Sequence, residues 1–157
     1  MLEKADLKAT MSKEEYQEKI APLKEKLEGL DAPMKDAALP VIILFEGWEC
    51  AGKGNIISKL ILNFDPRWFK LWDTLPPTAE ELREPVMWRH WKTIPEAGRM
   101  SVLDRSWYQE VSNLRIENEI DELTNIRHMN EINNFEHGLI DNGYLVVKLF
   151  LHISKRR

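Results

Sequence analysis

One segment of the chain has the residue types and spacing of a phosphate-binding loop. Residues 47–53 read Gly-Trp-Glu-Cys-Ala-Gly-Lys and match the pattern G-x-x-x-x-G-K. Glycines allow the backbone to turn its amides towards phosphate oxygens, and a following helix adds the positive end of its dipole. Lys53 would place a cation on a transferring phosphoryl group, whose charge must be neutralised. The predicted phosphate-binding residues of this P-loop are Gly47, Gly52, Lys53 and Gly54.

The residues on either side of the loop predict the elements that would position it. Val41–Phe45 is a short continuous apolar run, typical of a strand buried on both faces. After the loop, apolar residues recur at helical spacing at Ile56, Ile57, Leu60 and Ile61. A strand, the loop and a helix in this order favour a true P-loop over a glycine-rich turn with a surface lysine.

The residue after the P-loop lysine is unusual. P-loops usually continue with Ser or Thr, whose hydroxyl binds magnesium, whereas this chain has Gly54. Magnesium would then depend more on carboxylates and water. Asp104, which follows an apolar run, is the first candidate ligand, and Glu49 within the loop is the second. A solvated loop acid is the alternative interpretation of Glu49.

Further apolar runs predict a sheet. Strands are expected at Trp68–Trp72, at Met100–Leu103 ending at Asp104, and at Tyr144–Leu151. One long helical segment, with apolar residues from Ile116 to Leu139 three or four residues apart, lies between the last two strands. Strands that alternate with helices indicate an α/β fold with a mostly parallel sheet.

The region from Thr78 to Trp91 is also expected to be helical. Thr78 with Glu81 fits a capping box that opens a helix toward Trp91, which Pro85 could disturb. An arginine within that helix, Arg89, lies between tryptophans and would need an anionic partner.

The N-terminal region is charged and helix-prone. Ser12–Gly29 shows helical spacing, with a kink or two short helices expected at Pro22, and Asp31-Ala32-Pro33 predicts a break. We therefore expect a helical extension over residues 1–35 and the main domain over residues 36–157.

Composition limits the classes of function. The net charge of −4 gives no global attraction to nucleic acid or to an anionic membrane, so positive charge for a polyanion must be concentrated locally. The apolar runs are too short to span a bilayer, and the residues near Met1 lack the order of a signal peptide. These features predict a cytoplasmic protein without nucleic-acid or membrane partners.

A second motif follows the strand at residues 100–103. Residues 104–108 read Asp-Arg-Ser-Trp-Tyr, in which the Asp can bind magnesium and Arg105 can clamp phosphate with its planar guanidinium. Together with Phe45–Gly54 and Asp65-Pro66-Arg67, this motif resembles the signature blocks of the polyphosphate kinase 2 family. The resemblance covers about residues 40 to 153.

The resemblance implies a P-loop kinase-like three-layer sandwich, Mg2+ dependence, and phosphoryl transfer between polyphosphate and a nucleoside mono- or diphosphate such as AMP or ADP. It implies that Asp104 and Glu49 bind the metal and act in catalysis with Lys53 and Arg105. It also implies that Arg105, Arg67 and Arg89 face the polyanion. We further expect a homo-oligomer.

The chain departs from the family pattern in two places. Family members usually have Asp where this chain has Glu49, and they continue into a basic lid near the point where this chain stops. We therefore expect the domain to lack its lid at the C-terminus, either as the N-terminal half of a tandem member or as a chain truncated before the lid. Two alternatives stay open: a degenerate, non-catalytic half with a binding or assembly role, and another ATP-dependent P-loop kinase of small molecules.

Overall fold

The computed structural model describes residue 6 and residues 9–117 and 120–153 of the chain. Their four strands form one parallel sheet in the order β2-β3-β1-β4. The strands are β1 (Val41–Gly47), β2 (Phe69–Asp73), β3 (Met100–Asp104) and β4 (Leu145–Leu151). Parallel pairing brings the carboxyl ends of all four strands to one edge, and the register aligns Phe45 of β1 with Asp104 of β3.

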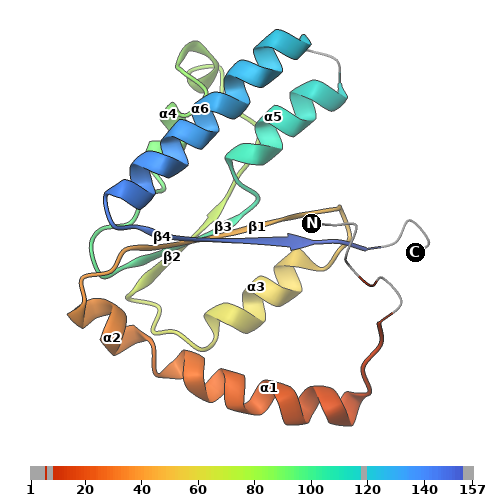
Figure 1. Ribbon diagram of the computed structural model, residues 1–157, viewed down its shortest axis with the longest axis vertical. Helices are drawn as coiled ribbons and strands as arrows, with labels where there is room; N and C mark the ends of the chain where they lie inside the picture. The colour runs from red at the N-terminus through yellow and green to blue at the C-terminus, as the bar shows by residue number, and fades with distance from the viewer. Residues whose placement is uncertain (1–5, 7–8, 118–119, 154–157) are drawn as a thin grey trace.

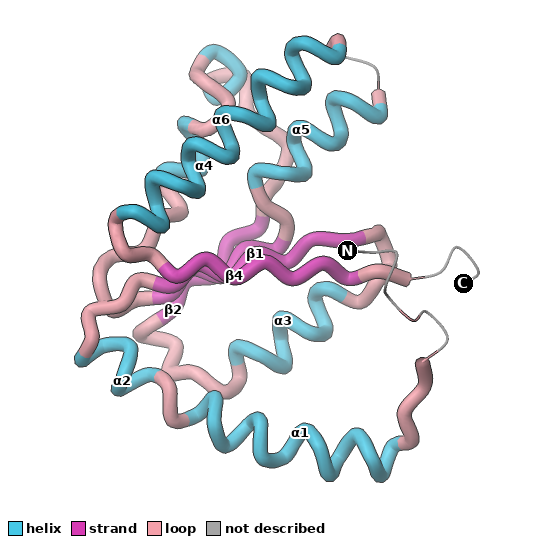
Figure 2. The backbone as a smooth tube through the Cα atoms, viewed as in Figure 1, coloured by secondary structure: helices cyan, strands magenta, loops and turns pink. Residues whose placement is uncertain are grey.

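Helices cover both faces of this sheet, which confirms the predicted three-layer α/β fold (Figure 1). One face carries α4 (Trp88–Trp91), α5 (Trp107–Ile116) and α6 (Glu122–Asp141), and the other carries α1 (Lys13–Glu28), α2 (Asp31–Asp36) and α3 (Lys53–Ile61). Figure 2 shows the strands as a single layer between the two groups of helices.

Each face of the sheet has its own apolar core. Ile42, Leu44 and Leu103 pack with Trp107 and the buried residues of α6. On the opposite face, Phe45 belongs to a second cluster that includes Ile57 of α3 and the partly buried Leu27 of α1. A strand buried on both faces explains why Val41–Phe45 is a continuous apolar run rather than an alternating one.

The prediction of a single long helical segment before the last strand is wrong, because the structure has two helices there, α5 and α6. Each has its own N-cap, because the Ser106 side chain accepts a hydrogen bond from the backbone N–H of Tyr108, and the Asp121 side chain accepts one from that of Thr124. Local caps therefore divide an apolar pattern that periodicity alone reads as one segment.

Proline positions explain three further differences from the sequence prediction. Of the two alternatives predicted at Pro22, a kink or two short helices, the second is wrong, since α1 runs through this exposed residue. The segment Asp31-Ala32-Pro33 is the start of a helix rather than a break. Pro33 lies in the first turn of α2, where a backbone N–H has no helical partner. The helix predicted from Thr78 toward Trp91 is reduced to a 3-10 turn, Glu81–Arg83, and the separate α4, with Pro85 between them.

None of the described helices has both the length and the apolar character needed to cross a membrane.

Candidate active site at the carboxyl edge of the sheet

The predicted P-loop connects β1 to α3 at the carboxyl edge of the sheet. Gly47 has a φ of +132°, and a Cβ atom at this position would collide with the backbone of Leu151 in β4. Gly52 has a φ of +86° and is the N-cap residue of α3, whose first residue is Lys53. Both positions therefore require glycine, and the loop leads directly to the positive end of a helix dipole.

The Lys53 ammonium group bends back over this loop. Its Nζ atom donates hydrogen bonds to the backbone oxygen of Gly47, at 3.0 Å, and to that of Trp48, at 3.1 Å. The half-buried side chain is thus fixed at two points, and the cation lies at the mouth of the loop.

The second predicted motif forms a tight turn between β3 and α5. Arg105 has a φ of +65°, a left-handed conformation that is uncommon for a residue with a side chain. Its backbone N–H donates to the oxygen of Phe45 at 3.0 Å, and its own oxygen accepts a bond from the Thr74 hydroxyl at 2.8 Å. Contacts to two neighbouring strands therefore hold the turn in this conformation.

Glu46 supports the same turn and is a residue that the sequence reasoning missed. Its Oε1 atom accepts hydrogen bonds from the backbone N–H of Ser106, at 2.7 Å, and from the Ser106 hydroxyl, at 2.6 Å. The signal available in the sequence was an acid at the end of an otherwise apolar strand, next to the P-loop. Glu46 joins the end of β1 to the start of α5.

The P-loop and the turn border one cavity of about 410 Å³. It brings together four residues predicted as catalytic: Glu49, Lys53, Asp104 and Arg105. Gly52 and Gly54 also line it. Two cations and two carboxylates therefore face a space next to backbone amides at a helix start, an arrangement that suits a phosphate and a divalent metal.

Asp104, which lines this cavity, has an unsatisfied carboxylate oxygen. Its Oδ1 is buried and has no hydrogen-bond partner in the structure, and such atoms are uncommon in folded proteins. The described residues contain no cluster of three or more potential metal ligands. Mg2+ at phosphoryl-transfer sites is held by one or two carboxylates together with phosphates and water, so Asp104 with Glu49 fits this type of site.

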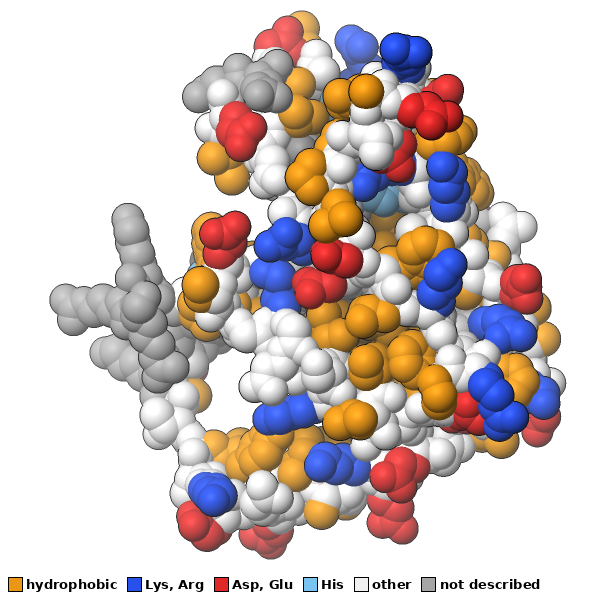
Figure 3. All heavy atoms as spheres, turned by 180° about the vertical axis from the view of Figure 1, so that it is seen from behind, with side chains coloured by type: hydrophobic (Ala, Val, Ile, Leu, Met, Phe, Trp, Pro, Cys, Tyr) orange, Lys and Arg blue, Asp and Glu red, His pale blue; other side chains and the backbone are white. Residues whose placement is uncertain are grey.

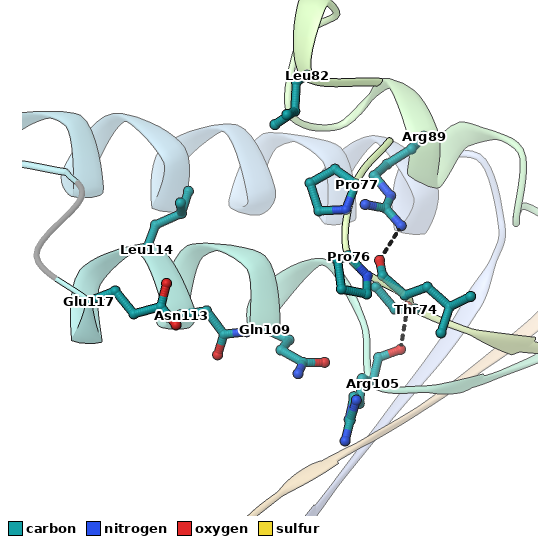
Figure 4. A pocket seen from close by; sticks show the side chains of 11 residues that line it. Thr74, Pro76, Pro77, Leu82, Arg89, Arg105, Gln109, Asn113, Leu114 and Glu117 are labelled. Atoms are coloured by element: carbon teal, nitrogen blue, oxygen red, sulfur yellow. Dashed lines mark hydrogen bonds between the residues drawn. The ribbon is translucent and has the colours of Figure 1, made fainter. Parts of the chain in front are cut away.

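Figure 4 shows a second cavity, of about 460 Å³. Arg105 lines both cavities. The walls of the second are the loop after β2, with Thr74 and Pro77, and one side of α5, with Gln109 and Asn113. Gln109 contributes a side-chain oxygen that is buried and has no hydrogen-bond partner. This cavity therefore has apolar walls and a few polar groups, as small-molecule sites do.

Arg89 lies in this second cavity, away from Lys53. One of its guanidinium nitrogens donates to the backbone oxygen of Leu75 at 2.6 Å, and the other terminal nitrogen is 3.8 Å from the Glu81 carboxylate. The backbone N–H of Thr78 lowers the pKa of Glu81, and the Arg89 charge adds to this effect. Arg89 thus joins the loop after β2 to the 3-10 turn, and Glu81 is an anionic neighbour, although the buried Nη1 atom makes no hydrogen bond.

Arg67 is a predicted site residue that lies far from both cavities, whereas Gly47, which lines neither, belongs to the P-loop itself. It precedes β2, at the amino edge of the parallel sheet, whereas the P-loop follows β1 at the carboxyl edge. Its guanidinium donates to both oxygens of Asp65, with Nε at 3.0 Å from each and Nη2 at 2.5 Å from Oδ2. These bonds lower the pKa of Asp65 to about 2.

A buried carboxylate binds the two residues that follow the turn between β3 and α5. Glu136 of α6 accepts hydrogen bonds from Trp107 Nε1 at 3.1 Å, from the Tyr108 hydroxyl at 2.7 Å and from Lys148 Nζ at 2.6 Å. Burial, together with the bond to Glu136, raises the pKa of Tyr108. Burial alone would lower the pKa of Lys148, but its bonds to Glu136 and Tyr108 outweigh this and raise it. The network connects α5, α6 and β4.

Trp48 lies on the outer side of the P-loop and is 53% exposed. Its indole N–H donates to Nδ1 of His152 at 2.9 Å, and its ring meets that of Phe150 edge-on at 6.4 Å. The loop is therefore connected to the residues at and after the end of β4.

Comparison with known proteins gives one consistent result. The family model described as polyphosphate kinase 2 matches residues 10–157. A polyphosphate:AMP phosphotransferase of Pseudomonas syringae is 37% identical over 99% of this chain and 31% of its own length. An ADP-polyphosphate phosphotransferase 3 of Rhizobium meliloti is 31% identical over 93% of this chain and 51% of its own.

A solved structure gives the same result for the fold. The crystal structure of polyphosphate kinase 2 from Arthrobacter aurescens has a TM-score of 0.92 and 29% identity, over 99% of this chain and 58% of that one. The chain thus spans 31% to 58% of the length of these relatives.

Proposed function

The chain belongs to the polyphosphate kinase 2 family, and from this premise we propose that it transfers a phosphoryl group between polyphosphate and a nucleoside mono- or diphosphate. The observation that carries the proposal is the P-loop cavity, where Lys53, Arg105 and Asp104 meet. These residues come from two loops about 50 positions apart in sequence, and both follow the carboxyl ends of adjacent strands.

In this proposal the cations neutralise the transferring phosphoryl group. The P-loop amides and the start of α3 hold the phosphate, and Lys53 exchanges its bonds with the Gly47 and Trp48 oxygens for bonds with phosphate oxygens. Arg105 lines both cavities and so reaches the group as it passes from donor to acceptor. Catalysis of this kind depends on position and charge rather than on covalent chemistry.

We propose that Asp104 and Glu49 hold Mg2+ in the same cavity. The unpartnered Oδ1 of Asp104 supports this role. When bound, the ion neutralises charge on the phosphates. Glu46 keeps Asp104 in place through its two bonds to Ser106.

We assign the cavity of Figure 4 to the nucleotide. Its apolar residues, such as Pro77 and Leu114, offer surfaces for a base, and the unpartnered Gln109 oxygen can accept a bond from an amino or hydroxyl group of the nucleotide. Arg89 holds the loop that forms one wall, through Leu75. AMP and ADP, which differ by one phosphate, are both candidates. The cytoplasmic location and the homo-oligomer stay predictions.

The test is Mg2+-dependent conversion of AMP or ADP with polyphosphate as donor. We would compare this chain with one extended by the segment that follows the matched region in a longer relative, and use Lys53→Ala versions of both as controls. Product from either unmodified chain, but not from its Lys53→Ala version, supports the proposal.

No product from either chain, with polyphosphate still bound, would instead favour a degenerate half with a binding role. The replacement of the family's usual Asp by Glu49 is the observation that favours this second candidate. Transfer from ATP that polyphosphate cannot support would indicate another kind of small-molecule kinase.

A further inference from the structure

A third cavity, of about 400 Å³, lies towards the other edge of the sheet, beside the amino end of β3 and along β2 as far as Trp72. Its charged lining residues are Lys70, Lys92, Arg99 and Glu96. Two tryptophans, Trp68 and Trp72, also line it. We call this set, together with Lys35 next to Trp68, the basic–aromatic patch. Figure 3 views the molecule from the β2 side, where Lys and Arg side chains lie among hydrophobic ones, with some Asp and Glu side chains between them.

The cations of the patch are held by aromatic rings. Lys70 Nζ lies 3.8 Å from the centre of the Trp72 ring, and Lys92 Nζ lies 3.7 Å from that of Trp88. Lys35 Nζ lies 4.5 Å from the centre of the Trp68 ring. A ring face attracts an ammonium group without neutralising its charge, so these lysines are positioned and remain cationic towards solvent.

Few carboxylates offset this charge. Among the described side chains, Lys35, Lys70 and Lys92 take part in no ion pair, although the Lys92 charge adds to the lowering of the Glu81 pKa that the Thr78 backbone N–H mainly causes. Arg99 lies 3.4 Å from the carboxylate of Glu96, which is 85% exposed. On a chain whose net charge is −4, four cations against one acid form a local positive field.

We propose that the basic–aromatic patch is a second binding site for polyphosphate, separate from the P-loop. The inference rests on the proposed function, since it concerns the same substrate. Polyphosphate carries charge along its whole length, and an open cavity with several positioned cations fits such a polymer.

The rings favour bare polyphosphate over single-stranded nucleic acid. Proteins bind single strands by stacking bases on aromatic side chains. In this patch Lys70 lies over Trp72, and both Lys35 and Arg99 lie over Trp68, with Arg99 at 5.4 Å. A base would have to displace these cations in order to stack, whereas a phosphate chain can contact them where they are.

The position of the patch gives it a role. The four steps of β3 from Met100 to Asp104 separate the two edges by about 13 Å, because a strand rises about 3.3 Å per residue. A long polyphosphate can contact both edges, whereas tripolyphosphate cannot cover both. A polymer held at the patch would raise the local concentration of phosphate at the P-loop.

The experiment measures binding in a Lys53→Ala background, which weakens the P-loop site. The test variant adds Lys70→Gln and Lys92→Gln, and the matched control adds Lys13→Gln and Lys24→Gln, two exposed lysines of α1. We expect the test variant to bind long-chain polyphosphate at low salt on the order of tenfold more weakly, and the control to change by less than about twofold. Equal affinities of the two variants would overturn the proposal.

Two further measurements complete the test. Melting curves establish that the variants fold, and the indole N–H resonances of Trp68 and Trp72 should shift in the Lys53→Ala chain when polyphosphate is added. Unchanged resonances would overturn the site. Single-stranded DNA with the same number of phosphates should bind more weakly than polyphosphate, and equal affinity for the two polymers would also overturn the site.

The outcome is independent of catalysis. Patch binding by the Lys53→Ala chain supports this site even if the unmodified chain transfers no phosphate. Turnover without patch binding overturns this site and leaves the proposed function intact.

Discussion

The two edges of the sheet hold their lysines in different ways. At the carboxyl edge, Lys53 donates hydrogen bonds to two backbone oxygens. At the amino edge, Lys70 and Lys92 lie over tryptophan rings. A carbonyl oxygen fixes a donor in distance and direction, whereas a ring face tolerates a range of positions. The first arrangement suits one phosphate in one place, and the second suits a polymer that can bind in many registers.

The carboxylates differ in the same sense. Asp104 and Glu49 line the P-loop cavity, and Asp104 has a buried oxygen without a partner. Among the described residues that line the patch cavity, the exposed Glu96 is the one acid. A pair of acids beside a phosphate site suits a metal ion, while a nearly acid-free patch suits a bare polyanion. Under the two proposals, the chemistry belongs to the carboxyl edge and the retention of the polymer to the amino edge.

The largest expected effect comes from Lys53→Ala. If the P-loop edge carries the chemistry, loss of its directed cation should lower the rate of polyphosphate-dependent nucleotide phosphorylation by on the order of 10²–10³. Initial rates measure the effect. Lys59→Ala, an exposed lysine of the same helix, is the control and should change the rate by less than about twofold. A loss below tenfold in Lys53→Ala would break the comparison.

Arg105→Gly separates charge from backbone at the same edge. Because Arg105 has a φ of +65°, glycine should relieve strain and keep the free energy of unfolding unchanged or raise it by about 1 kcal/mol. The same change should lower the phosphorylation rate about a hundredfold through loss of the guanidinium. Denaturation and rate measurements would be made on the same sample. A chain that loses stability and activity together would show that Arg105 is needed for the fold instead.

Glu49→Asp examines the metal side of the comparison. A carboxylate that is one methylene shorter matches the usual family residue, and we expect a rise in rate on the order of tenfold, because small errors of position are costly in catalysis. Glu49→Gln is the control and should lower the rate. The dependence of the rate on Mg2+ concentration should change in both variants; if it changes in neither, Glu49 is a solvated loop acid.

Glu136→Gln tests the hydrogen bonds that join α6 to α5 and β4 next to the carboxyl edge of the sheet. The variant weakens three hydrogen bonds to a buried group and should lower the free energy of unfolding by about 1–3 kcal/mol. Urea denaturation measures the change, with Glu25→Gln, an exposed acid of α1, as the control. An unchanged free energy of unfolding would mean that packing alone fixes this turn.

The smallest effect concerns Arg67, which lines neither the P-loop cavity nor the cavity of the basic–aromatic patch. In Arg67→Gln the pKa of Asp65 should rise from about 2 towards its ordinary value of 3.8, as measured by NMR titration. The lowered pKa stabilises the folded chain above pH 3.8, and this contribution is lost as the pH falls through 2. Wild-type stability should therefore decline over this window more than that of the variant. A polyphosphate affinity that falls in Arg67→Gln would instead return this residue to a binding site.

The sequence was most informative where a pattern has one physical cause. The P-loop and the motif at residues 104–108 each require particular residues, and parallel strands bring loops at their carboxyl ends together. The P-loop cavity could therefore be anticipated from Lys53, Asp104 and Arg105 alone. Arg67 could not be placed in this way, because a motif's resemblance does not say at which end of a strand its side chain lies.

Long-range partners were the other limit of prediction. Glu46 acts through Ser106, which is 60 positions away, and Glu136 acts through Trp107, which is 29 positions away. Periodicity carries no signal for such pairs, because it describes one element at a time. The division between α5 and α6 was missed for a related reason: it depends on the side-chain caps Ser106 and Asp121 rather than on apolar spacing.

The position of Trp48 gives the P-loop an optical readout of its own. Its ring is half exposed, and its indole N–H bond to His152 depends on the position of the loop. The emission of this indole should then report occupancy of the loop in real time, without a label. With Trp48→Phe as the control that identifies the share of this indole in the signal, stopped-flow fluorescence could separate the arrival of polyphosphate from the later transfer step.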